Sequence, residues 1–459
     1  MSFDFYFYLL VFFVLVFAVL ISRILWYAKD VPKSELFYQE SSEVVKKIIA
    51  NCQCLNENYV PTYLWGKSGH IQSMLYTIFG RFGRIPPVGS KRYKLVADDG
   101  TQVSFDIFEA LESAKETSKT ILVVPGICNH AENVYIRAFS SHMTNLGYTV
   151  VIFNHTGALK SIELKKPKIF TYGQTDDLDF VVQTLLRTRN VKKLIAVGFS
   201  LGANILMKYL GEKPNRQENF YFAASICQGY NVPECNVLMQ EKENLRWMYN
   251  YGLTRNMLRV ILHHKDTLSK HLNSRDPPLD LNWKKISSAK ALNELDLEFT
   301  IKLAEENSIE ELYENCSSSK YLENIYIPLL ILNAKDDPLI PEQLFKYPKN
   351  LIGINHKVLF VVTPYGGHMG YFEGGVIFPD RLSWVDRLLA QYIGSTLDIL
   401  KDKESRKEGV GEKDESVKDE KPRNIKEKGL LRNREERETD SSSEEDGFTF
   451  VKPTFNITK

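Results

Sequence analysis

The chain carries almost no surplus of charge of either sign. Its 459 residues include 58 Lys and Arg against 57 Asp and Glu, which leaves a formal net charge of +1. Domains that bind nucleic acids usually carry a positive surplus, so the composition argues against a nucleic-acid partner. No internal repeat is visible, and this excludes the solenoid and propeller architectures that repeats build.

Cysteine is scarce, and its spacing matches no metal site. The six cysteines are Cys52, Cys54, Cys128, Cys227, Cys235 and Cys316. Zinc-binding pairs commonly have two residues between the cysteines, whereas Cys52 and Cys54 have one. Small secreted scaffolds need a denser disulfide framework than this. The sequence therefore predicts neither a metal ion nor a disulfide-based fold.

One long hydrophobic run is present, at the N-terminus over residues 5–28. Phe5–Ile21 is apolar without a break, and Ile24–Ala28 continues it after Ser22 and Arg23. A run of this length crosses a hydrocarbon layer of about 30 Å as a helix. It has no basic residue before it and no Ala-x-Ala motif after it, so it lacks the marks of a cleaved signal peptide. We expect an uncleaved single-pass membrane anchor.

The orientation of this anchor stays open. Five Lys and Arg residues follow the unbroken stretch Phe5–Ile21 within residues 23–47 and none precedes it, which favours a cytoplasmic location for the rest of the chain. Three N-glycosylation motifs begin at Asn154, Asn315 and Asn456 and would have a role only on the opposite side of the membrane. Such motifs arise easily by chance, so they do not decide the question.

A G-x-S-x-G pentapeptide stands at Gly198–Gly202. It follows an apolar strand-like run, Leu194–Val197, and precedes a helix-like run, Ala203–Leu210. Strand, tight turn and helix in this order are the context of a nucleophile elbow, which lifts the serine hydroxyl above the sheet. The two glycines lack a Cβ, so strand and helix can pack closely there. We expect Ser200 to be a nucleophile; the competing interpretation is a serine that only caps the helix.

Partners for this serine follow in the order that an elbow serine requires, with the acid first and the histidine second. The buried-strand pattern Pro328–Ala334 leads into Asp336 and Asp337, and the pattern Lys357–Pro364 leads into His368. Asp337 is favoured as the acid because Asp-x-x-apolar-Pro resembles the acid loop of many hydrolases, and Asp336 stays the alternative. In such a set the histidine takes the serine proton and returns it to the leaving group, while the carboxylate orients the ring. This chemistry needs no metal or cofactor.

Two backbone N–H groups are expected to stabilise the oxyanion of such a reaction. One belongs to Leu201, the residue after the nucleophile. The other comes from the loop after an earlier strand; Thr120–Val124 fits that strand, and Ile127 lies in the loop that follows. Cys128, beside Ile127, is a candidate reactive thiol, although a packing role is favoured.

Strand and helix patterns alternate along the middle of the chain. The further strand patterns are Arg92–Ala97, Thr101–Glu109, Thr149–Phe153 and Phe220–Gln228, and a helix pattern runs from Thr175 to Arg189. Asp98-Asp99-Gly100 between the first two strands is a hairpin signal. Alternation of this kind predicts an α/β fold with a mainly parallel central sheet and helices on both faces. The site is then expected at the carboxyl ends of the strands.

The remaining segments set the domain boundaries. We expect a catalytic domain over residues 30–395. Residues 229–325 interrupt the alternation with helix-prone sequence, which predicts a helical cap over the site. Residues 400–459 are rich in charge and almost free of aromatics, so a disordered tail is expected there.

Five motifs together resemble the membrane-anchored lipase branch of the α/β-hydrolase-domain proteins. The motifs are Tyr63–Gln72, Gly198–Gly202, Lys208–Glu212, Asn333–Leu339 and Gly366–Gly374. The resemblance runs from about Asp30 to Ile393. Ala203 departs from it, since a second glycine is expected after the elbow, and the charged tail has no counterpart.

The resemblance implies an α/β-hydrolase fold and a membrane-bound serine hydrolase. Its implied substrates are monoacylglycerols, such as 2-arachidonoylglycerol, and simple esters. It also implies stimulation by a progesterone-like steroid, and an N-terminal anchor in the plasma membrane or the endoplasmic reticulum. Its usual orientation, with the N-terminus inside, conflicts with the charge count. Two other functions stay open: a lipid- or steroid-binding receptor or scaffold with low turnover, and an acyltransferase.

Overall fold

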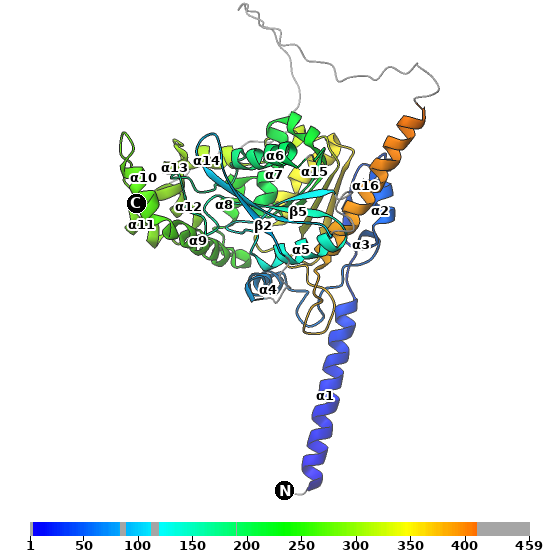
Figure 1. Cartoon of the computed structure of the whole chain (residues 1–459). Coiled ribbons are helices and arrows are strands. Elements are labelled where there is room, and N and C mark those ends of the chain that lie inside the picture. The colour runs from blue at the N-terminus through cyan, green and yellow to red at the C-terminus, as the bar shows by residue number, and fades with distance from the viewer. Residues whose placement is uncertain (1–2, 83–88, 112–118, 190, 411–459) are drawn as a thin grey trace, which may run out of the picture. The chain divides into compact units, whose positions relative to one another are not determined.

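The computed structural model describes residues 3–82, 89–111, 119–189 and 191–410. The chain divides into two compact units, residues 1–406 and residues 407–459. Every strand lies in the first unit, which also contains the elements that form the site (Figure 1).

A nine-stranded sheet, in the order β1-β9-β8-β7-β6-β4-β5-β3-β2, forms the centre of the fold. The strands are β1 (Glu35–Phe37), β2 (Lys91–Val96), β3 (Gln102–Phe108), β4 (Thr120–Val124), β5 (Thr149–Asn154), β6 (Leu194–Phe199), β7 (Phe220–Ile226), β8 (Leu329–Ala334) and β9 (Val358–Thr363). The six strands β4 to β9 pair in parallel, whereas β1 and the β2–β3 hairpin pair antiparallel at the edges. The predicted mainly parallel sheet is therefore confirmed, and β1 is an addition to it.

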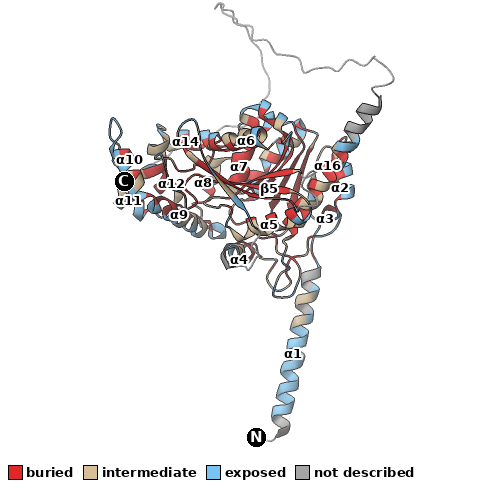
Figure 2. Ribbon diagram, in the orientation of Figure 1, coloured by how far each residue is buried: buried red, intermediate tan, exposed pale blue. Residues whose placement is uncertain are grey.

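Helices cover both faces of the sheet, because the parallel strands are apolar on both sides (Figure 2). One buried cluster joins a face of the sheet to α2 (Glu43–Asn51), α3 (Gln53–Asn56), α5 (Val134–Asn145) and α16 (Trp384–Val410). A second cluster joins the other face to α6 (Asp176–Thr188), α7 (Leu201–Glu212), the short helix η6 (Glu342–Phe345) and α15 (Lys346–Ile354). Outside the β7–β8 connection, the described residues also form α4 (Gly69–Phe82), η2 (Pro214–Asn219) and the N-terminal helix α1 (Phe3–Lys29).

The connection between β7 and β8 is built mainly of helices, as the sequence predicts. It contains α8 (Val232–Leu238), η3 (Glu243–Leu245), α9 (Arg246–His263), α10 (Lys265–Asn273), α11 (Trp283–Ser288), α12 (Leu292–Leu295), the π-helical turn η4 (Asp296–Thr300), α13 (Ile301–Ala304), α14 (Ile309–Cys316) and η5 (Leu322–Asn324). These helices bury an apolar cluster of their own against the segment that follows β5, which includes Ile169 and Phe170. The insertion is therefore a packed subdomain and not a loose loop.

The N-terminal helix α1 (Phe3–Lys29) contains one candidate membrane span, Tyr6–Trp26. It is long and apolar enough to cross a membrane, a property that signal sequences share. Its described side chains are mostly exposed; Phe12 and Phe17 are 60% and 64% exposed. A water-soluble helix would not leave so many apolar side chains uncovered, so this helix needs a lipid or protein environment.

The predicted boundaries at the C-terminal end need correction. Helix α16 continues to Val410, through the limit expected for the catalytic domain at residue 395 and past the expected start of the tail at residue 400. Lys, Glu and Arg dominate this stretch and are good helix formers, so charge alone does not end a helix that has already been nucleated. The rest of the expected tail, residues 411–459, lies outside the described residues.

Candidate active site

Ser200 stands at the turn between β6 and α7, in a strained backbone conformation. Its φ is 53° and its ψ is −118°, a region that residues with a side chain rarely adopt. A Cβ on Gly202 would overlap the Val124 carbonyl oxygen, and a Cβ on Gly198 would overlap the backbone of Ala203. Both glycines are therefore required for the close approach of strand and helix, and the turn has the geometry of a nucleophile elbow.

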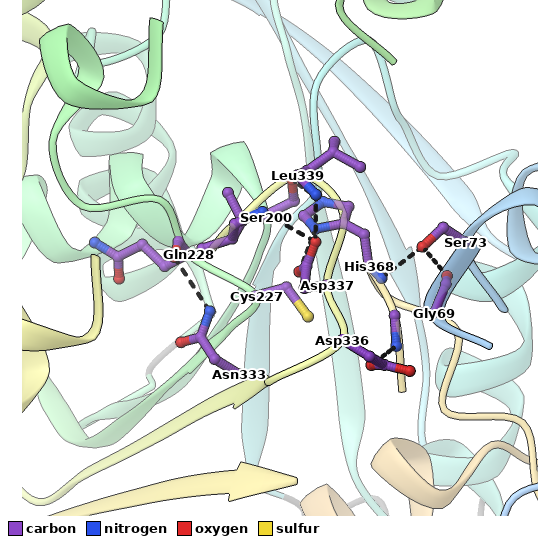
Figure 3. A network of polar contacts seen from close by, with 12 residues as sticks. Gly69, Ser73, Ser200, Cys227, Gln228, Asn333, Asp336, Asp337, Leu339 and His368 are labelled. Carbon is purple, nitrogen blue, oxygen red and sulfur yellow. Dashed lines mark hydrogen bonds and ion pairs between the residues drawn. The ribbon is translucent and has the colours of Figure 1, made fainter. Parts of the chain in front are cut away.

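A continuous chain of hydrogen bonds joins Ser200, His368 and Asp337 (Figure 3). The Ser200 Oγ lies 2.8 Å from His368 Nε2, and His368 Nδ1 lies 2.9 Å from Asp337 Oδ2. The other carboxylate oxygen of Asp337 accepts the N–H groups of Leu339 and Ile340 at 2.8 and 3.0 Å. The carboxylate is fully buried and held by three donors, so it fixes the ring with Nε2 free to accept the serine proton.

Asp336 points to a different partner. Its Oδ1 accepts the N–H of Gly367 at 2.8 Å, and its Oδ2 is buried without a hydrogen-bond partner among the described residues. Burial raises the pKa of Asp336 from 3.8 to about 7, and the nearby charge of Asp337 adds to the rise. The structure thus brings Asp337 to the imidazole ring and leaves Asp336 on the backbone of the histidine loop.

The raised pKa of Asp336 makes stability depend on pH. Between about pH 4 and pH 7 the folded chain holds a proton that the unfolded chain has lost, so this contribution is complete at low pH and is lost as pH rises through 7. Asp336→Asn keeps an acceptor for Gly367 but cannot ionise. We expect the variant to match the wild-type melting temperature near pH 4 and to exceed it by several degrees at pH 8. A difference that is constant with pH would contradict this assignment.

The backbone of the histidine loop is held by α4, a contact that the sequence analysis missed. Ser73 Oγ accepts the N–H of His368 at 2.7 Å and donates to the Gly69 carbonyl at 2.7 Å (Figure 3). The neighbouring Gln72, fully buried, accepts the N–H of Phe372 at 2.9 Å. The end of the motif Tyr63–Gln72 and the Ser73 that follows it therefore support the histidine loop.

Removal of the Ser73 hydroxyl is expected to misplace His368. In Ser73→Ala we expect kcat for ester hydrolysis to fall by about 10- to 100-fold with little change in KM, because the ring moves while the wall of the larger cavity loses only one hydroxyl oxygen. Thr77→Ala is the matched control, since its hydroxyl bonds the Ser73 carbonyl at 3.0 Å and not the histidine loop. Equal losses in the two variants would show a general effect on α4.

The two N–H groups expected to bind an oxyanion lie beside Ser200. A Cβ on Gly126 would come 3.5 Å from the Ser200 Cβ, so the loop that contains Ile127 runs against the nucleophile. The Tyr135 hydroxyl accepts the Gly126 N–H at 3.2 Å and orients this loop. Neither Ile127 nor Leu201 donates its N–H to another described residue. Both amides are thus available to a ligand oxygen, as an oxyanion hole requires.

Thiols near the site are protonated and packed. Burial raises the pKa of Cys128 to about 12, and its sulfur contacts Met257, which fits the predicted packing role. Cys227 lies with Asp337 and His368 in a group whose ligand atoms are within 4.8 Å of one another. Burial also raises the pKa of Cys227, so this thiol is a poor metal ligand, and the other two groups already bond each other.

Two cavities meet at Ser200. One has a volume of about 140 Å³ and is lined mainly by apolar residues of α7, α8, α9, α12 and α14. The other, of about 560 Å³, lies between α4 and α9. Both are lined by Ile127, Ser200, Leu253, Leu339 and His368. His70 of α4 bonds the Tyr249 hydroxyl of α9 at 2.9 Å and links these two walls.

Comparisons with known proteins show the family of the chain. The model of the α/β hydrolase fold family matches residues 119–375. Monoacylglycerol lipase ABHD2 of Homo sapiens is 38% identical over 360 residues, which cover 78% of this chain and 84% of the relative. Phospholipase ABHD3 of Mus musculus is 29% identical over 349 residues, which cover 75% of this chain and 80% of the relative.

The solved structure of the esterase Pf2001 of Pyrococcus furiosus aligns with this chain at 15% identity and a TM-score of 0.39. The aligned region covers 62% of this chain and 88% of the esterase chain. The family match and the 38% identity over most of the chain carry the assignment. The chain belongs to the α/β-hydrolase fold family.

Proposed function

We propose that this protein is a membrane-bound serine hydrolase that cleaves monoacylglycerols, such as 2-arachidonoylglycerol, and simple esters. The observation that carries the proposal is the hydrogen-bonded series Ser200–His368–Asp337, with two unengaged backbone N–H groups beside the serine. The identity of 38% to a protein named monoacylglycerol lipase supports the choice of substrate.

The proposed reaction has two steps. His368 Nε2 takes the Ser200 proton as Oγ attacks the acyl carbonyl, and the oxyanion is stabilised by the N–H groups of Ile127 and Leu201. His368 then protonates the departing glycerol oxygen, which leaves an acyl-enzyme. A water molecule, activated by the same ring, hydrolyses this ester and releases the fatty acid. Asp337 keeps Nδ1 protonated and stabilises the imidazolium in both steps.

The experiment that tests this function follows the products of the full chain in lipid nanodiscs. We expect free arachidonate and glycerol from 2-arachidonoylglycerol, and free butyrate from a soluble butyrate ester. Transfer of the acyl group to an added alcohol in place of water would favour the acyltransferase. Tight lipid binding without release of fatty acid from any ester would favour the receptor or scaffold.

Stimulation by a steroid is a further part of the proposal, and it rests on the resemblance alone. The test compares initial rates of 2-arachidonoylglycerol hydrolysis with and without progesterone in the same nanodiscs. A rise in rate supports regulation by a steroid, and equal rates at saturating steroid would remove it from the account.

We also propose that α1 anchors the protein and that residues 229–325 act as a cap over the site. The anchor is supported by the candidate span Tyr6–Trp26, and the cap by the insertion residues that line both cavities. Full-length protein is expected to stay in the membrane after carbonate extraction and to keep its N-terminal helix on mass analysis. A mature chain that begins after residue 28 would identify a signal sequence instead.

Glycosylation at one motif tests on which side of the membrane the catalytic domain lies. Asn154 is buried in β5, where its amide donates to Asp106 at 2.8 Å, so it cannot accept a glycan in the folded protein. Asn315 is exposed. A glycan on Asn315, lost in Asn315→Gln, would place the domain in the endoplasmic reticulum lumen or outside the cell, whereas its absence in a cell that glycosylates a lumenal control supports a cytoplasmic domain.

A further inference from the structure

The two cavities that meet at Ser200 differ in charge. The smaller cavity is lined, among the described residues, by no Asp, Glu, Lys or Arg side chain. The larger cavity is lined by Arg255 and Arg259, and no Asp or Glu lines it in the described part of the chain. A substrate that spans the nucleophile therefore meets an uncharged wall on one side and a cationic wall on the other.

The two arginines stand on the same face of α9, one helical turn apart. Both are exposed, and neither forms an ion pair with a described carboxylate. Arg259 donates one hydrogen bond to the Asn256 amide oxygen at 2.6 Å. This bond holds its side chain at the larger cavity, which is called the groove from here on. By contrast Arg246, at the start of α9, is buried and paired with Glu241. The groove thus contains two guanidinium groups whose charges no carboxylate among the described residues neutralises.

The cationic wall continues into a polar cleft of about 540 Å³. The two spaces adjoin each other, since five residues line both: Ile127, Asn129, Asn133, Asn256 and Arg259. Lys160 adds a third positive charge to the cleft. Its single acid among the described lining residues, Glu132, is already paired with Arg92 at 2.9 Å. The end of the groove farther from the apolar cavity is therefore suited to a polar, negatively charged group.

We propose that this groove is a subsite for a phosphate on the alcohol part of the substrate, so that acyl esters of glycerol phosphate are substrates as well as neutral monoacylglycerols. Guanidinium groups bind phosphate through paired, charge-assisted hydrogen bonds, and two of them one turn apart can share its oxygens. The first carbons of the acyl chain then enter the uncharged cavity, and the ester carbonyl lies at Ser200. The inference rests on the proposed hydrolase function and adds a class of substrate to it.

The chemistry at the ester is unchanged for this substrate. The acyl group passes to Ser200 Oγ, the glycerol oxygen takes the proton from His368, and water releases the fatty acid. The phosphate ester bond stays intact, and glycerol phosphate is the second product. Arg255 and Arg259 bind the phosphate and do not touch the reacting atoms.

The test compares 1-oleoylglycerol with 1-oleoylglycerol 3-phosphate, which share one acyl chain, on the full-length protein in detergent micelles. We expect wild type to hydrolyse both. In the double variant Arg255→Gln/Arg259→Gln the ratio of kcat/KM for the phosphate ester to that for the neutral ester is expected to fall about 10- to 100-fold. The double variant Arg187→Gln/Lys270→Gln removes two exposed charges away from the groove and is expected to keep the wild-type ratio.

The outcomes separate this proposal from the function on which it rests. Hydrolysis of the neutral ester without hydrolysis of the phosphate ester would overturn the phosphate subsite and leave the proposed function standing. Failure with both esters would remove the proposed function itself. A groove variant that folds, with a wild-type melting temperature, and yet loses activity equally on both esters would show that the arginines shape the groove and do not bind phosphate.

Discussion

Ser200→Ala is expected to lower kcat for ester hydrolysis by at least about 10⁴-fold, since removal of the nucleophile from such a triad leaves only binding and oxyanion stabilisation. Labelling by a fluorophosphonate probe is expected to disappear with it, because the probe reacts only with an activated serine. The fold should persist, as alanine needs no more space at the elbow than serine. The measurements are fatty-acid release and probe fluorescence on membranes that contain equal amounts of each protein.

Ser287→Ala is the matched control for this change. Ser287 is exposed on α11 and its hydroxyl bonds only the Trp283 carbonyl, so the variant is expected to keep both labelling and turnover. A Ser200→Ala protein that still reacts with the probe and releases fatty acid at the wild-type rate would exclude Ser200 as the nucleophile.

Asp337→Asn is expected to lower kcat by about 10⁴-fold, a loss of the size that follows when a triad aspartate becomes an amide. The amide can donate to Nδ1, which favours the imidazole tautomer with its proton on Nε2, where it cannot accept the serine proton. Substrate binding should change little, so the effect is expected in kcat and not in KM. The measurement is a full rate profile with 2-arachidonoylglycerol.

The neighbouring Asp336→Asn supplies the comparison. Its carboxylate bonds the Gly367 N–H and not the imidazole, so we expect a loss of no more than about tenfold. The reverse pattern, with the larger loss in Asp336→Asn, would assign the acid role to the alternative residue.

Local sequence was sufficient to predict those parts of the site whose geometry depends on residues close together in the chain. The elbow at Ser200 needs a strand, two glycines and a helix within a few residues, and these can be read directly. The same holds for the strands that lead to Asp337 and His368, because each is a continuous apolar run ended by polar residues. The alternation of strands and helices then predicted the parallel sheet.

Contacts between distant segments could not be read in this way. Ser73 and His368 are 295 residues apart, and no local pattern marks the serine as the acceptor of that N–H. Strand β1 has only three residues and exists because it pairs with the edge of β9. Arg255 and Arg259 look like an ordinary solvated helix face until the fold places them in the groove with Ser200.

The most direct test of the central claim is to map the residue that the fluorophosphonate probe modifies on the full-length protein. Membranes that contain the active wild type are labelled, and the digested protein is analysed by mass spectrometry. We expect the adduct on the peptide that contains Gly198–Gly202, at Ser200, and expect an excess of monoacylglycerol to reduce its yield. An adduct at another residue, or no adduct on a protein that hydrolyses the ester, would contradict the account.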